Sequence, residues 1–453
     1  MRLRIRDLLF ISVVLPIALL QGCASSSLFS PYPGQASAWR SGIESNQPLV
    51  GLAKVDAKIT GQDGLLYLQE KARLEQLGGE NTASLETFES VFTRYADEDA
   101  QAKLRASGAV SGTASLLTND NALPYQGYAY ERIMAHAFQT FNYLAANDVE
   151  GASVEVRRAA LEQRVAELAH EKEIAKAEED AKDNNVDVSQ FDGYFQGVNS
   201  AAAGVTSSIT NAWTYYLSAA FWEGRGEYND ALVDYKKALS LAPNVEFLKA
   251  DITRVSQKLD RRFKSDKGLV VILHEQGLVP PKQEVMIPIP TIHGYFSIAF
   301  PTYGPDLVAP VPLHAQGEIE NASTEVFVRV NGAAAKALKE KIPGMLVRQT
   351  LRAATKYAAQ KQANDNLGLF GALTTQIYNL VSERADLRSW LSLPAYGMAT
   401  RMELPAGMQV IKLSAQGGNA SVEVPVRAGG VTIVRVIEAG GFLRTEVYPI
   451  KEG

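Results

Sequence analysis

The chain has 453 residues, of which 46% are hydrophobic and 21% are charged. This composition excludes a wholly disordered chain, and the length is enough for two or three domains with hydrophobic cores. The formal net charge of −5 argues against a general nucleic-acid-binding surface, so we expect no nucleic-acid partner.

The N-terminus has the features of an export signal. Three arginines precede an apolar run over residues 8–20, which is too short to span a bilayer comfortably. Residues 19–23 read LLQGC and resemble the lipobox of bacterial lipoproteins. The resemblance implies cleavage before Cys23, lipidation of Cys23 and, because Ala24 follows, attachment to the outer membrane on its periplasmic face. The alternative is an ordinary secreted protein with a stray cysteine, which is the only one in the chain.

Composition and pattern divide the chain into five segments. A signal peptide covers residues 1–22, and a Ser-, Pro- and Gly-rich lipidated tether covers 23–48. A helical domain is predicted over 49–265, a mixed α/β domain over 266–396 and a β-rich module over 397–453. The expected fold class is therefore α+β.

The stretch from residue 212 to 245 organises the helical domain. Its apolar residues recur at helical spacing, glycines interrupt it at 224 and 226, and a small residue, Ala231, stands where two helices would touch. It resembles one tetratricopeptide-like hairpin. One hairpin cannot bury its own apolar face, so similar patterns at 65–95 and 124–160 predict neighbours that stack beside it. We expect the stack to form a concave groove for an extended peptide or a partner helix.

Residues 159–182 continue the second hairpin as a long charged helix. Opposite charges three and four residues apart favour a solvated helix, and a coiled-coil contact is the alternative. After residue 267 the pattern changes to short β-rich runs, with helices predicted over 342–361 and 367–381. The tail from 398 to 448 predicts five short strands and resembles small β-sandwich modules of envelope proteins.

Several short runs resemble a family of uncharacterised proteobacterial lipoproteins with tetratricopeptide-like repeats. They are Tyr130-Glu131-Arg132, His136, Asn142-Tyr143-Leu144, Val154-Glu155, Arg157-Arg158 and the run RADLRSWLSLP over 384–394. Members of that family are often associated with loci for penicillin-binding-protein activators. The resemblance implies a role in the cell envelope, with partners among periplasmic or envelope proteins that include the cell-wall synthesis machinery.

Three groups of residues are candidates for partner binding. Each group also has a structural interpretation. The first group, Arg132, His136 and Asn142, either lines a groove or forms a buried hydrogen-bond network between hairpins. The second group, Arg157 and Arg158, either holds a carboxylate of the partner or pairs with Glu155 or Glu131. The third group, Asp386, Arg388 and Trp390, is either an interaction hot spot or a structural corner.

The sequence shows no catalytic or metal-binding motif. His274, His293 and His314 have separations that match no metal site, and neither a G-x-S-x-G elbow nor a P-loop is present. We therefore expect no cofactor and predict a non-enzymatic, lipid-anchored, protein-binding scaffold that serves envelope assembly or peptidoglycan synthesis. The alternatives are an envelope enzyme acting on glycan or peptide, and a subunit of a larger envelope assembly.

Overall fold

The computed structural model describes residues 30–106, 121, 123–184, 186–261, 265–291, 294–305, 307–352 and 384–452. The predicted signal peptide, Cys23, His293 and the predicted helix over 367–381 lie outside the described residues. Helices fill the first part of the described chain and strands dominate the second, so the predicted α+β class is confirmed.

Most of the helices before the first strand follow one another through short connections, whereas residues 107–128 separate α5 from α7. Residues 330–352 are also helical and lie between two strands. The earlier helices are α2 (Tyr32–Glu44), η2 (Pro48–Gly51), α3 (Leu52–Asp56), α4 (Gly64–Gly78), α5 (Asn81–Ala106), α7 (Ala129–Ala145), α8 (Val149–Asp183), η4 (Val188–Phe195), α9 (Gln196–Ala202), α10 (Ala212–Arg225), α11 (Tyr228–Leu241) and α12 (Phe247–Leu259).

Tight turns join six of these helices into the three predicted hairpins. The α4–α5 turn uses Gly79 at φ 87°, the α7–α8 turn uses Asn147 at φ 57°, and the α10–α11 turn uses Gly226 at φ 82°. Glycine and asparagine accept this left-handed conformation most readily, which is why they end helices. The next helix starts with help from local polar groups, as where the Asp148 side chain accepts from the backbone N–H of Gly151 at the start of α8.

The strands form three sheets. The five-stranded sheet has the order β11-β10-β1-β7-β6, the four-stranded sheet has the order β5-β4-β8-β9, and β2 and β3 form a hairpin. β1 and β10 are parallel, whereas β1 and β7 are antiparallel. The strands are β1 (Lys267–Gln276), β2 (Gln283–Thr291), β3 (Gly294–Thr302), β4 (His314–Gln316), β5 (Asn321–Ser323), β6 (Glu325–Arg329), β7 (Tyr396–Pro405), β8 (Gly407–Ala415), β9 (Gly418–Val426), β10 (Val431–Ala439) and β11 (Phe442–Pro449).

The five-stranded and four-stranded sheets pack as a sandwich. Val270 and Ile272 of β1 belong to the apolar cluster between the two sheets. Leu269 and Val271, which point to the opposite face, belong to the core shared with the helices. Because successive side chains alternate between faces, β1 is buried on both sides, which explains its almost unbroken apolar sequence.

The predicted boundary between residues 396 and 397 falls inside one strand. β7 begins at Tyr396, and β1 from the predicted α/β domain lies between β7 and β10 from the predicted β-rich module. The two predicted C-terminal segments therefore build one sandwich together. Local sequence patterns could not predict this arrangement, because more than 150 residues separate β1 from its partner β10.

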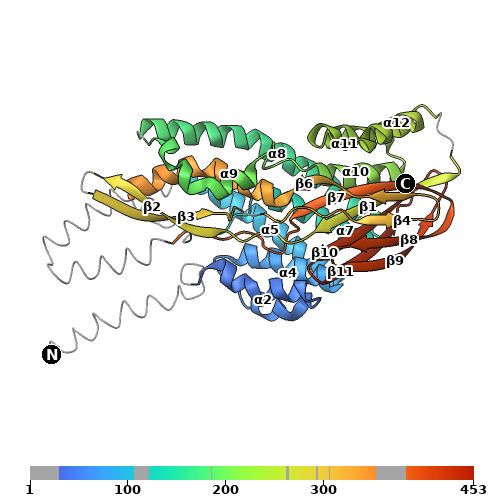
Figure 1. Cartoon of the computed structure of the whole chain (residues 1–453), viewed down its shortest axis with the longest axis horizontal. Coiled ribbons are helices and arrows are strands. Elements are labelled where there is room, and N and C mark those ends of the chain that lie inside the picture. Colours follow the sequence, from blue (N-terminus) through green and yellow to red (C-terminus); the bar gives the residue numbers. More distant parts are fainter. Residues whose placement is uncertain are drawn as a thin grey trace.

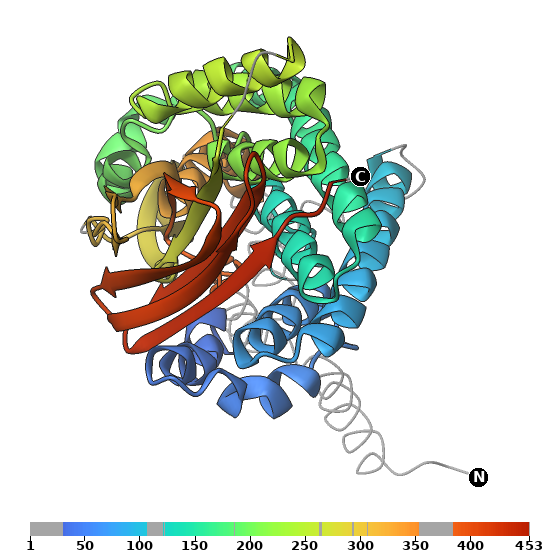
Figure 2. The same ribbon diagram turned by 90° about the vertical axis from the view of Figure 1, so that its right-hand side faces the viewer.

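The helices curve as an arc around the five-stranded sheet (Figures 1 and 2). In Figure 2, α2 to α4 lie below the sheet, α5, α7 and α8 lie beside it, and α10 to α12 lie above it. Trp213 of α10 is fully buried, and its Nε1 donates to the Met398 carbonyl of β7 over 3.0 Å. The inner side of the arc is thus packed against the chain's own sheet, which corrects the expectation of an open concave groove.

The first described helix also corrects the predicted tether. Within residues 23–48, α2 buries Tyr32, Ala36, Trp39 and Ile43 in the main core. The turn between β10 and β11 contacts the end of this helix, where the Gly441 N–H donates to the Glu44 carbonyl over 2.8 Å. The apolar residues of α2 recur at helical spacing, and the Pro- and Ser-rich composition around them hid that signal.

A buried ionic network joins α4 to the sheet. Arg73 of α4 pairs with Glu275 of β1, and Arg435 of β10 donates to the same carboxylate from Nε over 2.6 Å. Arg435 also donates from Nη2 to Gln76 of α4 over 2.9 Å. The guanidinium of Arg73 lies over the ring of Phe138 at 4.1 Å. Removing Glu275 would take away the carboxylate that Arg73 and Arg435 share across the two layers, so the helical layer and the sheet form one structural unit.

Candidate partner-binding surface

His136 and Asn142 of α7 lie in contacts between hairpins. His136 is 8% exposed; its Nδ1 lies 2.7 Å from Oε2 of Glu155 on α8, and its ring stacks on Phe92 of α5. Asn142 is 1% exposed and donates to Oγ of Ser84 on α5 over 2.9 Å. These contacts match the structural interpretation, a buried hydrogen-bond network, because neither polar group faces an open groove.

Arg132 joins the same three helices at their edge. Its two terminal nitrogens donate to the carboxylate of Asp99 on α5 over 2.9 and 2.7 Å. Nη1 lies 3.6 Å from Glu162 on α8, and the guanidinium lies over the ring of Tyr95 at 4.5 Å. The planar guanidinium is therefore engaged on its edges and on one face, which is the geometry of a clamp between helices.

Two buried carboxylates of the helices hold the backbone of residues 390–391. Glu131 of α7 is fully buried and accepts from the Trp390 N–H over 2.9 Å and from the Tyr125 hydroxyl over 2.6 Å. Glu70 of α4 accepts from the Leu391 N–H over 2.8 Å, and burial raises the pKa of this carboxyl. Sequence reasoning missed both roles, although the tyrosines around Glu131 were a signal for a buried acceptor.

Asp386, Arg388 and Trp390 form a structural corner in this segment. Arg388 is 3% exposed and pairs with Asp386 over 2.7 Å and with Asp63 over 2.5 Å. Burial alone would raise the pKa of Asp386, but Arg388 outweighs it and lowers that pKa to about 2. Trp390 is fully buried and packs edge-on against Phe138 of α7.

Arg157 and Arg158 differ from the other candidates because both are exposed on α8. Nη1 of Arg158 donates to Oε1 of Glu155 over 2.7 Å, yet its side chain remains 49% exposed. Arg157 lies over the ring of Trp222 on α10 at 4.4 Å, and this contact holds its guanidinium on the outer surface. These two arginines are the sequence-predicted residues that remain available to a partner.

An exposed apolar stripe runs beside them along α8. The α8 stripe consists of Val154, Leu161, Val165 and Leu168, whose exposures are 44%, 54%, 54% and 70%. Their separations of seven, four and three residues place all four on one face of the helix. Single exposed apolar residues are common, but an aligned row at heptad spacing is the pattern of a helix that packs against another helix.

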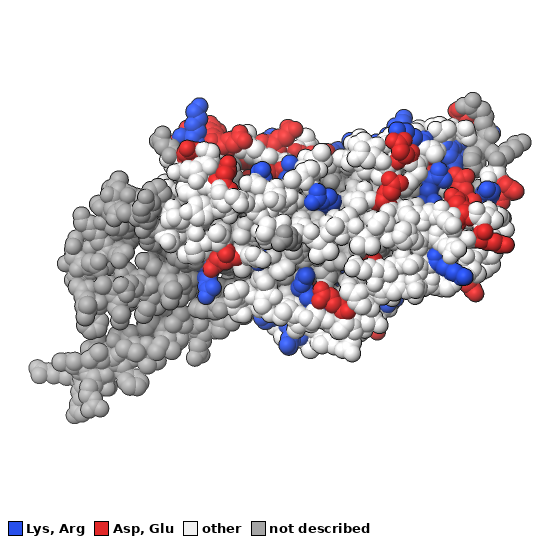
Figure 3. All heavy atoms as spheres, viewed as in Figure 1, with Lys and Arg blue, Asp and Glu red and all other residues white. Residues whose placement is uncertain are grey.

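Positive charge flanks this stripe. Arg157, Arg158 and Arg164 border it over two turns, and Arg164 forms no ion pair within the described part of the chain. Of the nearby carboxylates, Glu155 is buried and Glu162 pairs with Arg132, while Glu167 is exposed three residues after Arg164. Acidic groups instead crowd the upper rim of the molecule toward the other end of α8, as Figure 3 shows.

We also considered the described part of the chain for a catalytic or metal-binding site. A hollow of about 280 Å³ lies between α8, α9 and the helix over residues 330–352, with Glu178, Glu340 and two lysines on its wall. His274 is buried and lies 3.0 Å from Glu438. Within the described ranges, no three His, Cys, Asp or Glu side chains gather as a metal site would require. Across those same ranges, no helix has the length and apolar character needed to cross a bilayer.

The chain was also compared with known proteins. Models of protein families, curated proteins and solved structures were compared with the chain, and none matched. The resemblance to envelope lipoproteins therefore stays a prediction from the sequence runs, and the geometry of α8 is the main structural guide to function.

Proposed function

We propose that this protein is a non-enzymatic lipoprotein of the outer membrane that acts as a periplasmic protein-binding scaffold. The lipobox-like run ending at Cys23 supports the anchor, which would hold the chain at the periplasmic face. The helical hairpins support a tetratricopeptide-like scaffold, since Ala231 is buried at the contact between α10 and α11. Envelope assembly or peptidoglycan synthesis is the process we propose that it serves.

The outer face of α8 is the proposed binding surface. The arc's inner side is filled by the sheet, so a partner has to bind on the outside. The observation that carries the proposal is the α8 stripe: four exposed apolar side chains in register on one helix. When a partner covers these side chains, each Å² of apolar surface removed from water stabilises the complex by about 25 cal/mol.

The occupant of this surface is an amphipathic helix of a partner protein, with carboxylates beside its apolar row. Such carboxylates would lie opposite Arg157, Arg158 and Arg164, which border the stripe. Arg157 is already held by its stacking on Trp222, so less side-chain entropy is lost when it binds. A helix with basic flanks would meet like charge, which gives the surface its specificity.

Site-specific photo-crosslinking in intact cells tests this surface. A crosslinker at Leu168, which is 70% exposed, should yield one defined adduct. A crosslinker at Val233 of α11, which is 58% exposed, is the matched control and should not yield it. Replacing Arg157 and Arg164 by Glu should abolish the adduct, whereas Leu161→Glu should weaken it without lowering stability.

Three results would contradict the proposal. An adduct of twice the chain's mass would identify a second copy as the occupant. Equal adducts from Leu168 and Val233 would show contact without a specific site. An adduct that survives charge reversal at Arg157 and Arg164 would show that the arginines do not select the partner.

A further inference from the structure

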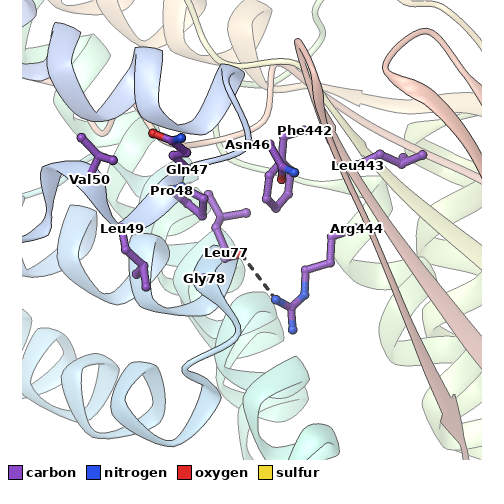
Figure 4. Close-up of a pocket in the computed structure, with 10 residues that line it drawn as sticks. All are labelled: Asn46, Gln47, Pro48, Leu49, Val50, Leu77, Gly78, Phe442, Leu443 and Arg444. Carbon is purple, nitrogen blue, oxygen red and sulfur yellow. Dashed lines mark hydrogen bonds between the residues drawn. The ribbon is translucent and has the colours of Figure 1, made fainter.

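A pocket opens where the helical layer meets the edge of the five-stranded sheet (Figure 4). Its volume is about 370 Å³, within the range of small-molecule sites. Three distant parts of the chain line it: residues 46–50 after α2, Leu77 and Gly78 at the end of α4, and residues 442–444 at the start of β11. No predicted site residue lies in it.

Most of the pocket wall is apolar. Pro48, Leu49, Leu77 and Phe442 line it, and Figure 4 shows Phe442 directed into the space between the helices and the strand. Leu49 is 38% exposed, so its side chain is covered on one side only. A Cβ at Gly78 would lie 2.5 Å from Cδ2 of Leu49, so glycine at this position lets the leucine form the wall.

One cation faces this apolar wall. The guanidinium of Arg444 points from β11 toward α4, and its side chain is 30% exposed. Nε donates to Oε1 of Glu446 over 2.9 Å, and Nη1 lies 3.5 Å from the Leu77 carbonyl, at the limit of a hydrogen bond. Nη2 makes no hydrogen bond to the part of the chain that the structure describes.

The ionic network behind the pocket carries a net positive charge. Arg444 belongs to the ionic network between α4 and the sheet, in which Glu446 also accepts from Arg435 over 3.2 Å and from the Tyr448 hydroxyl over 2.7 Å. Among the described residues, the network contains three arginines and two glutamates: Arg73, Arg435 and Arg444 against Glu275 and Glu446. One positive charge is left over, and Arg444 is its member at the surface.

We propose that this pocket binds a small amphiphilic anion, with its charged head group on Arg444 and its apolar body against Leu49, Leu77 and Phe442. A charge-assisted hydrogen bond to the guanidinium would supply orientation, and burial of the apolar body would supply most of the affinity. A free acyl carboxylate and an anionic phospholipid present the same chemistry. This site is independent of the α8 stripe and of the proposed protein partner.

Calorimetric titration of the full-length lipoprotein tests the site. The protein is placed in nanodiscs of zwitterionic phosphatidylcholine and titrated with octanoate, with empty nanodiscs as the blank. Octanamide, which has the same apolar body without the charge, is the matched ligand. We expect octanoate to bind at least about tenfold more tightly than octanamide, and Arg444→Gln to remove that difference. Lys237→Gln, at an exposed position of α11, serves as the control variant and should leave it unchanged.

A second pair of variants avoids the buried network altogether. Val50 lies at the mouth of the pocket and is 62% exposed. Val50→Asp should weaken octanoate binding because its negative charge repels the carboxylate, and Val50→Lys should strengthen it because its positive charge attracts the carboxylate.

Discs that contain phosphatidylglycerol distinguish the two sources of the anion. Loss of octanoate binding in these discs would identify the bilayer lipid as the natural source, and retained binding would identify a free carboxylate. Equal affinity for octanoate and octanamide, no heat above the blank, or no effect of Arg444→Gln and of the Val50 pair would each overturn the proposal.

Discussion

Replacing Glu223 by Gln is expected to loosen the contact between α10 of the third hairpin and α12. Glu223 of α10 is 2% exposed and accepts from Nε and Nη2 of Arg254 over 2.8 and 2.9 Å. Nζ of Lys258 lies 3.0 Å away, and the Lys258 ammonium also donates to the Gly429 carbonyl next to β10. Glutamine fits the same space but removes the negative charge, so two buried cations face a neutral amide while Arg254 keeps its pair with Asp251 at 2.6 Å.

The pKa of Glu223 sets the size of this effect. Burial alone would raise that pKa, but Arg254 and Lys258 outweigh burial and lower it from 4.5 to about 2. A folded-state pKa below the unfolded value stabilises the protein above pH 4.5, and this stability is lost as the pH falls toward 2. At about 1.4 kcal/mol per unit, the charge contributes about 3 kcal/mol at pH 7 and about 1 kcal/mol at pH 3.

Urea denaturation at pH 7, 5 and 3 measures this contribution. The wild type should exceed Glu223→Gln by about 3 kcal/mol at pH 7, and the gap should shrink by about 2 kcal/mol at pH 3. Other carboxyl groups titrate in both proteins, so their effects largely cancel in the difference. Glu246→Gln is the matched control on a surface pair, because Glu246 is 76% exposed, and it should change stability by less than about 0.5 kcal/mol. A gap below about 1 kcal/mol at pH 7, or one that stays constant with pH, would refute the reasoning.

Three further substitutions test the packing in the same denaturation assay. Trp390→Ala should cost about 3–5 kcal/mol because the ring is fully buried against α7, and a cost below about 1 kcal/mol would contradict that placement. Gly197→Ala should cost about 1–3 kcal/mol because its new Cβ would lie 1.8 Å from the Tyr303 carbonyl oxygen, whereas Gly193→Ala meets nothing within 4 Å and should be neutral. Leu161→Glu should change stability by less than about 0.5 kcal/mol, since the side chain is 54% exposed; a larger loss would place the α8 stripe in the fold rather than at an interface.

The hairpins could be predicted because their signals are local. Each helix carries an apolar row at a spacing of three and four residues, and each of the three turns contains a glycine or an asparagine that the structure places in the left-handed region. The long charged helix over 159–182 lies within α8 for the same reason. Even the pairing of Arg158 with Glu155 was open to sequence reasoning, because three residues separate neighbours on a helix.

The sheet and the roles of the candidate residues could not be predicted in this way. β1 pairs with β10 across residues 277–430, and no local pattern encodes that partner. Arg388 resembles a surface hot spot in the sequence, yet its partner Asp63 is 325 residues away. A buried charge and an exposed charge look alike in a sequence, because burial depends on the partner that the fold brings to it.

The packed interior of the arc determines where binding is possible. An open helical stack exposes its inner face because each hairpin contacts only its neighbours, and its stability is then a sum over hairpins. Here the inner faces also contact the sheet through Trp213, Arg73 and Lys258, so opening the arc to admit a peptide would expose buried charges as well as apolar surface. Each buried ion pair that loses a partner costs about 3–5 kcal/mol, which would offset the contribution of about one interface hot spot. A partner that binds the outer face of α8, or a ligand that enters beside Arg444, avoids this cost because both sites are accessible without any change in the core.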